Sequence, residues 1–225
     1  MTTKLELVQR LAREAGASGS ITTTINQSGE SRRLVDWIDT AHQEIESAHQ
    51  DWQWLRTSAS FVTVNSKATY TPVECGVTDF GMWARDSFRC YNTAAGLPSE
   101  IYMAYIDYEV WRNTYQYGSL RTSYQQPIEI SITPAKSLAL GPVPTGDYTI
   151  IGDYYRAPRI LANDANEPDM PEHFQIAVVW RALMFYGGYE NAPEAINRGQ
   201  VEFSRMMTRM ATDRLPAVGF GDSLA

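Results

Sequence analysis

Apolar residues recur every three to four positions near both ends of the chain, which is the spacing of helices that bury one face. Near the start, this pattern covers Thr3 to Ala15 and is followed by Gly16, a residue that often ends a helix. A small, polar segment from 17 to 29 follows and predicts a loop. A second helical pattern then extends to about Trp52, with an acidic outer face. The N-terminal part is therefore predicted to be two helices joined by a polar loop.

The strongest helical signal lies between Asp164 and Arg214, and the rest of the chain is expected to pack on it. Asp169 is placed to cap the first of two helices, and Pro171 suits a helix start because its missing N–H would be unpaired there. The residues that follow are apolar on nearly every side, which is typical of a buried helix. A Gly-Gly pair interrupts the pattern, and a second helix is predicted from about Pro193. Its apolar residues are spaced for one face: Ile196, Val201, Phe203, Met206, Met207 and Met210.

Between these helical regions the pattern changes to the alternation of half-buried strands. The segments that predict strands are 60–64, 68–72, 87–91, 126–133, 137–141 and 146–156. Residues 101–117 carry apolar groups at helical spacing and predict a short helix. Strands bracketed by helices, without β-α-β alternation, indicate an α+β fold. We predict a helical bundle from residues 1–55 and 162–214, an inserted antiparallel β-rich subdomain from 56 to 161, and an extended C-terminal tail from 215 to 225.

Composition narrows the class of protein. The chain has 225 residues, of which 44% are hydrophobic and 12% aromatic, enough for a core and too many for a disordered chain. The formal net charge of −7 argues against a general nucleic-acid binder, because such proteins neutralise phosphates with a basic face. The first ten residues do not have the pattern of a signal peptide. No run of about 18 apolar residues predicts a membrane span.

Candidate catalytic and ligand-binding residues are few. His42 and His49 share one predicted helix but lie seven positions apart, whereas metal ligands on one helix usually lie about three or four apart; we expect solvated histidines. Cys75 and Cys90 have no neighbouring cysteine or histidine pair, which predicts reduced thiols in the core. The acidic run at 163–167 lacks the spacing of a calcium loop. Nucleotide-binding and hydrolase motifs are missing from the sequence, so we predict no catalytic residue, no cofactor and no metal.

Several phrases in the sequence resemble tailed-bacteriophage head-to-tail adaptor (connector) proteins. One is Ala-His-Gln-Glu-Ile-Glu at 41–46 on the second helix, followed by Asp-Trp-Gln-Trp-Leu at 51–55. Another begins with Gly-Asp-Tyr at 146–148, continues through Tyr-Arg-Ala-Pro at 155–158, and leads into Met-Pro-Glu at 170–172 and Trp-Arg-Ala-Leu at 180–183. The resemblance covers about residues 5–214. In that family, helices from both ends of the chain form a bundle and a β-rich segment is inserted between them.

The resemblance implies a structural virion protein that forms a homo-oligomeric ring, usually of twelve copies, beneath the portal protein. The ring would extend the DNA channel, let double-stranded DNA pass without specific contacts, and offer a surface to a tail or nozzle protein. An acidic inner surface would repel phosphate and help DNA slide, although solubility also explains the acidity. The protein would be made in the host cytoplasm, would end in the neck of the virion, and would need no membrane.

The segment from 215 to 225 contains Pro and Gly and has no periodicity. We expect it to dock into the portal, and the alternative is that it folds back on its own subunit. The expected docking residues are Leu215, Pro216, Phe220 and Leu224.

Two other functions stay open at this point. The protein could be a tail nozzle or tube component, or a carbohydrate-binding or hydrolytic phage module that uses the β-rich insertion. The aromatic pairs Trp52/Trp54 and Tyr154/Tyr155 could stack on sugars or bases; burial where a helix meets a strand is the other interpretation.

Overall fold

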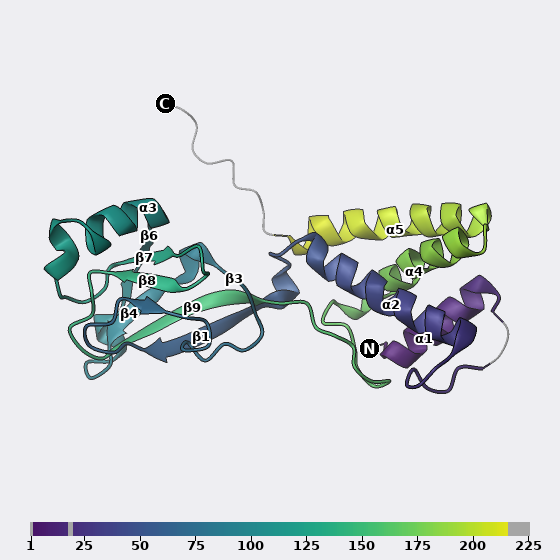
Figure 1. Ribbon diagram of the computed structural model, residues 1–225, viewed down its shortest axis with the longest axis horizontal. Coiled ribbons are helices and arrows are strands. Elements are labelled where there is room, and N and C mark those ends of the chain that lie inside the picture. Colours follow the sequence, from purple (N-terminus) through teal and green to yellow (C-terminus); the bar gives the residue numbers. More distant parts are fainter. Residues whose placement is uncertain (1, 18–19, 216–225) are drawn as a thin grey trace, which may run out of the picture. The chain divides into compact units, whose positions relative to one another are not determined.

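The computed structural model describes residues 2–17 and 20–215, and within them the protein is α+β (Figure 1). The chain divides into two compact units, and we describe each by itself. Residues 1–55 and 158–225 form the helical unit, and residues 56–157 form the β unit. The predicted fold class is confirmed: helices come from both ends of the chain, and the strands lie in the segment between them.

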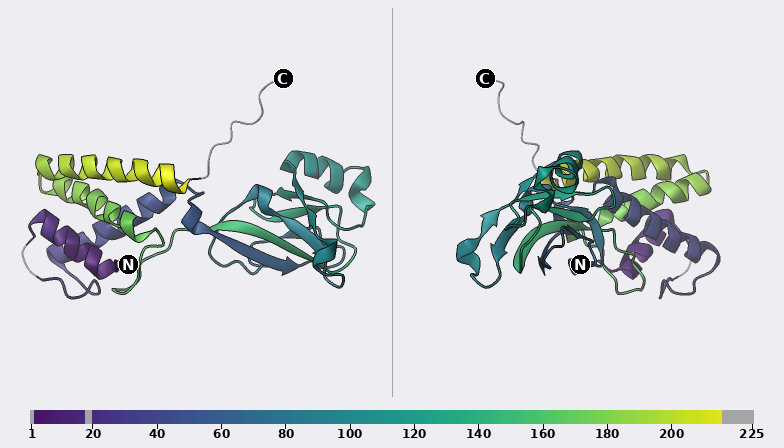
Figure 2. Two further views of the ribbon diagram at one scale, coloured as in Figure 1. Left: turned by 180° about the vertical axis from the view of Figure 1, so that it is seen from behind. Right: turned by 60° about the vertical axis from the view of Figure 1, so that its left-hand side comes forward.

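Four helices make up most of the helical unit, and α4 (Ile176–Tyr189) contacts the other three. These are α1 (Lys4–Ala15), α2 (Gly29–Ala48) and α5 (Pro193–Arg214). Figures 1 and 2 show α5 lying alongside α4. The two helices pack so closely that a Cβ added to Gly199 would lie 2.8 Å from the carbonyl oxygen of Trp180. The prediction that the first C-terminal helix is buried is confirmed, because α4 buries residues around most of its circumference.

Of the two C-terminal helices, the start of α5 was predicted correctly and the start of α4 was not. A 3₁₀ turn at Glu172–Phe174 precedes α4, and Pro171 is the residue flanking it, so Asp169 is not the N-cap that the sequence predicted. Helix α5 begins at Pro193 as predicted. Its apolar face is less buried than expected: Met210 is buried, Val201 is 66% exposed, and the other predicted residues are half-buried.

The N-terminal helices follow local signals. Thr3 and Glu6 form a reciprocal capping box at the start of α1, and Gly16 ends this helix with a φ of 68°, a value that glycine adopts without strain. Helix α2 stops at Ala48, before the predicted Trp52. Trp52 instead folds back into the core, where its Nε1 donates to the carbonyl oxygen of Ile45 at 3.1 Å. The predicted burial of this tryptophan at the helix–strand junction is therefore confirmed.

The segment that returns from the β unit is bonded to the N-terminal elements. The Lys4 ammonium group is buried and donates to Asp39 (2.7 Å) and to the carbonyl oxygen of Leu161 (2.8 Å). The Asp164 carboxylate accepts hydrogen bonds from the hydroxyl of Thr23 (2.7 Å) and from the backbone N–H and hydroxyl of Thr24 (2.6 and 2.5 Å). The acidic run at 163–167 thus lies in a loop, as predicted, and this loop orders the polar segment before α2.

Two sheets build the β unit. The first has the order β1-β9-β4-β5, with β3 also pairing with β9, and the second has the order β2-β8-β7-β6. Pairs are antiparallel except β6 with β7. The strands of the first sheet are β1 (Arg56–Val62), β3 (Phe80–Trp83), β4 (Arg89–Asn92), β5 (Ile101–Tyr102) and β9 (Tyr148–Arg156). Those of the second are β2 (Thr69–Tyr70), β6 (Ala104–Tyr105), β7 (Glu129–Ile132) and β8 (Leu138–Gly141).

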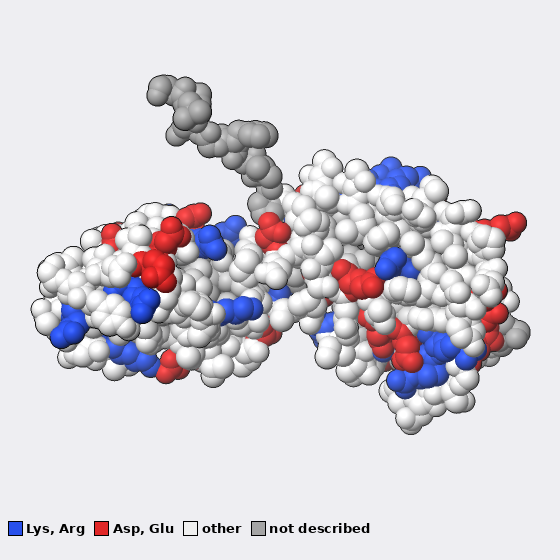
Figure 3. Space-filling view, turned by 45° about the horizontal axis from the view of Figure 1, so that its top comes forward, with Lys and Arg blue, Asp and Glu red and all other residues white. Residues whose placement is uncertain are grey.

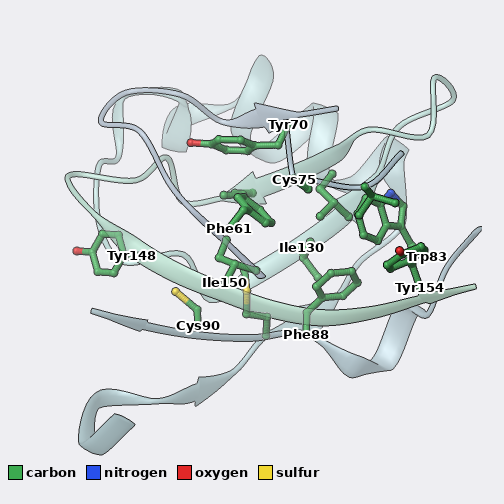
Figure 4. Packing of buried hydrophobic residues seen from close by; sticks show 14 residues of the cluster. Phe61, Tyr70, Cys75, Trp83, Phe88, Cys90, Ile130, Tyr148, Ile150 and Tyr154 are labelled. Atoms are coloured by element: carbon green, nitrogen blue, oxygen red, sulfur yellow. The ribbon is translucent and has the colours of Figure 1, made fainter. Parts of the chain in front are cut away.

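The core of the β unit lies between the two sheets. Figure 4 shows Phe61 and Ile150 of the first sheet and Ile130 of the second within one cluster of buried side chains. The opposite face of the second sheet packs on α3 (Tyr108–Trp111) and the π-helical turn after it, where Trp111 donates from Nε1 to the carbonyl oxygen of Leu140 at 3.0 Å. The β unit therefore has three layers, two sheets and one short helical segment.

The prediction of one helix over 101–117 is wrong for its first part. Residues 101–105 form β5 and β6, which belong to different sheets, and only the part from Tyr108 onward is helical. The buried Met103 lies between the two strands, and its N–H donates to the carbonyl oxygen of Phe88. Here the chain crosses from one sheet to the other, and hydrogen bonds to distant segments decide its conformation.

Candidate assembly surfaces

The histidines do not gather into a ligand site. His42 is 1% exposed on α2, and its Nε2 lies 3.2 Å from Glu46 Oε1. The other carboxylate oxygen of Glu46 accepts the backbone N–H of Arg159. The prediction of a solvated His42 is therefore wrong. Among the residues that the structure describes, no group of three or more His, Cys, Asp or Glu side chains is positioned to hold a metal ion.

The two thiols are part of the core of the β unit, as predicted. Burial raises the pKa of the Cys75 thiol to about 12 and that of Cys90 to about 11. Since the thiolate is the nucleophilic form, a raised pKa does not favour either cysteine as a nucleophile at neutral pH.

The carboxylate of Glu74 accepts hydrogen bonds from the Lys67 ammonium group and from the N–H and hydroxyl of Thr71, and these contacts hold its pKa at about 2.

Large apolar side chains on the surface are concentrated in the β unit. Those of the helical unit are Ile25, Ile160, Tyr189 and Val201. Those of the β unit are Val62, Val64, Val73, Leu97, Tyr102, Val110, Tyr117, Leu120, Tyr124 and Ile128. Half of the second set falls between 110 and 128, in and after the short helical layer. Exposed apolar groups that lie close together often mark protein–protein contacts. The alternating pattern of strands did not reveal this set, because most of its members lie outside the strands.

A groove of about 510 Å³ lies along the last turns of α5. The 3₁₀ turn before α4 supplies His173 and Phe174, and α5 supplies Met206, Arg209 and Thr212. Because α5 ends at Arg214, one residue after Asp213, which also lines the groove, the groove directly precedes Leu215. Of the predicted docking residues, Leu215 is half-buried at the end of α5. Pro216, Phe220 and Leu224 lie outside the described residues.

The negative charge is unevenly shared between the units. The helical unit contains 11 Lys and Arg against 17 Asp and Glu, whereas the β unit contains 8 against 9. On the face shown in Figure 3, acidic and basic side chains are interspersed. The excess charge is therefore a property of the helical unit and does not form one patch on this face. In the described part of the chain, no helix is long and apolar enough to cross a membrane.

An α+β chain whose two thiols are buried and whose surface carries large apolar groups fits the class of structural, assembling proteins. Comparison with protein families identifies the family within this class: the family model for the SU10 adaptor protein matches residues 2–219. The match covers nearly the whole chain, so the chain belongs to the SU10 adaptor protein family, and the protein is a phage structural adaptor and virion component. A search of curated proteins found no match.

Proposed function

We propose that the protein forms a ring, of twelve copies, that docks under the portal protein in the neck of the virion. The ring extends the DNA channel and provides the attachment surface for the tail or nozzle protein. The observation that carries this proposal is the adaptor-family match over residues 2–219. A component that joins two different partners needs separate surfaces, and the two compact units of this chain offer them.

The charge distribution supports a role for the helical unit at the DNA channel. Its excess of acidic residues is repeated in every copy, and negative charges on a channel wall repel DNA phosphates. Repulsion of this kind keeps the duplex from adhering during passage. The near-neutral β unit has no such effect on DNA and is free to make protein contacts.

We further propose that the segment from Leu215 onward docks into the portal, with Pro216, Phe220 and Leu224 as additional contacts. Helix α5 leads the chain directly to Leu215. Deleting residues 216–225 should abolish co-sedimentation with purified portal rings while leaving the thermal unfolding curve unchanged. The full-length chain is the matched control. Equal co-sedimentation of the two proteins would show that the segment is not the portal contact.

An electron cryo-microscopy reconstruction of the particle tests the whole proposal. We expect a ring of this chain between the portal and the tail, with the helical units closest to the DNA. Density for the chain farther along the tail would assign it to the nozzle or tube instead. Density elsewhere in the particle, without contact to the portal, would overturn the proposal.

A further inference from the structure

Within the described residues, the first strand of the β unit is paired on one side only and forms a long open edge. Strand β1 pairs with β9 over seven residues in unbroken antiparallel register, from Arg56 opposite Tyr155 to Val62 opposite Thr149. Among the described residues, no strand pairs with its other side. Even Thr57 and Ala59, on the core-facing side of β1, are only half-buried. An edge of this kind presents a row of unpaired N–H and C=O groups to the surroundings.

Hydrogen bonds around β9 show which groups of β1 face outward. The N–H of Thr63 donates to the carbonyl oxygen of Tyr148, whereas on the opposite side of β9 the N–H of Thr93 donates to Asp147. Residues of an antiparallel strand alternate between its two neighbours. Odd-numbered residues of β1 therefore bond to β9. The residues with outward N–H and C=O groups are Arg56, Ser58, Ser60 and Val62.

The other edges of the β unit are protected against added strands, and β1 is not. In the described part of the chain, β2, β5 and β6 each have two residues, β2 is followed closely by Pro72, and β3 has a register shift. Short strands, prolines and bulges are the usual means of blocking an edge. Strand β1 has no proline and no bulge. Its one charge, on Arg56, is paired with Asp153 of the same sheet at 2.7 Å.

We infer that the open edge of β1 binds an extended segment of a second copy of this chain, which adds a strand to the sheet. Copies of a chain with a net charge of −7 repel one another, so contact between them is favoured where charge is lowest. The β unit is nearly neutral. Along the edge of β1 the only charged side chain is that of Arg56, which is paired with Asp153, and the other outward positions are Ser58, Ser60 and Val62. This inference rests on the self-assembly proposed above and names the surface that carries it.

Ser60 is the position at which to test the edge. Its N–H points outward. The hydroxyl of Ser58 donates to Asp153 of β9, whereas the hydroxyl of Ser60 makes no such bond, so a substitution at Ser60 leaves the side-chain contacts to β9 intact. Ser60→Pro removes the outward N–H and places a ring on the edge, a change that edge strands tolerate when the N–H faces solvent. Ser60→Ala keeps the N–H and is the matched control. Both variants and the wild type are compared by mass measurement over a range of concentrations.

We expect wild type and Ser60→Ala to assemble equally, and Ser60→Pro to associate at least about tenfold more weakly, since backbone hydrogen bonds to the edge are lost. Amide hydrogen exchange of peptides covering β1 in the wild type is a second measurement that needs no substitution. Assembly should slow the exchange of Ser58, Ser60 and Val62. Unchanged exchange in the assembled protein, or full assembly of a folded Ser60→Pro variant, would overturn the inference.

The outcomes separate this inference from the proposed function. A wild-type chain that stays monomeric at every concentration refutes pairing with a second copy, whereas its place in the virion is decided separately by the particle reconstruction. A ring in the neck whose subunits leave the edge of β1 solvated would refute the strand contact and leave the adaptor role standing. Slow exchange at β1 together with loss of assembly in Ser60→Pro supports the strand contact, and the reconstruction alone tests the place in the neck.

Discussion

Replacing Gly152 by alanine should destabilise the β unit through one contact. Gly152 lies in β9, and a Cβ at this position would be 2.2 Å from a ring carbon of Phe88. Ordinary contacts begin at 3.4 Å, so the ring or the strand must move by more than 1 Å. Phe88 is 1% exposed and packs edge-on against Trp83 at a centroid distance of 5.8 Å. The ring therefore has little room to move.

Two opposing effects set the size of the change. Overpacking of a filled core costs about 1–3 kcal/mol, and replacing a flexible glycine in a strand returns about 0.5–1 kcal/mol. The net loss in the free energy of unfolding should be about 1–2 kcal/mol. For a cooperative unit of about 100 residues, this lowers the midpoint of thermal unfolding by roughly 5–15 °C. Urea denaturation followed by tryptophan fluorescence provides the free energies.

A control and a rescue isolate the contact. A Cβ on Gly146 would meet nothing within 4 Å, so Gly146→Ala should stay within about 0.5 kcal/mol of the wild type. Phe88→Leu in the Gly152→Ala background makes room for the added methyl group. The double variant should be more stable than the sum of the single effects by at least about 0.5 kcal/mol. If Gly152→Ala unfolds like Gly146→Ala, the packing of Phe88 against β9 described here is wrong.

Three further predictions concern single side chains. Cys75 and Cys90 should not react with a thiol reagent at pH 8 until the β unit unfolds, because burial raises both pKa values; rapid labelling of the native protein would refute this. The Glu74 carboxylate, whose pKa its hydrogen bonds lower to about 2, contributes stability that is complete above its ordinary pKa of 4.5 and is lost as the pH falls toward 2; carboxyl chemical shifts measure the midpoint, and a midpoint near 4.5 would contradict the geometry. Asp164→Ala should speed hydrogen exchange at the Thr24 amide, which donates to this carboxylate, while exchange in the β unit stays unchanged.

Local signals in the sequence were enough for most helices. The apolar spacing from Thr3 to Ala15, Gly16 after the first helix and Pro193 at the start of α5 all act within a few residues, and each helix begins or ends close to where they predict. The alternation at 126–133 and 146–156 likewise predicted β7 and β9. These elements bury one face of a regular pattern, so their own sequence contains the needed information.

The failures have non-local causes. Ile101 and Tyr102 pair with β4, and Ala104 and Tyr105 pair with β7, so partners far along the chain override the helical spacing of this segment. For His42 the sequence did contain a signal. It lies four positions after Ile38 and three before Ile45, both buried, so it falls on the apolar face of its helix, and this position predicted burial. The open edge of β1 could not be predicted, since an edge is defined only by the order of strands in the sheet.

The pairing of β1 with β9 brings the two ends of the β unit together, so that the unit is inserted in the chain at one place. The chain enters the unit at Arg56 and leaves it at Ala157, and Arg56 lies directly opposite Tyr155 in the register of the two strands. Both junctions thus occupy one end of a single strand pair. A short turn that joins residue 55 to residue 158 could close the helical unit, and any other β domain with adjacent termini could be grafted there. Exchange of the β unit at these junctions would leave the sequence of all four long helices unchanged.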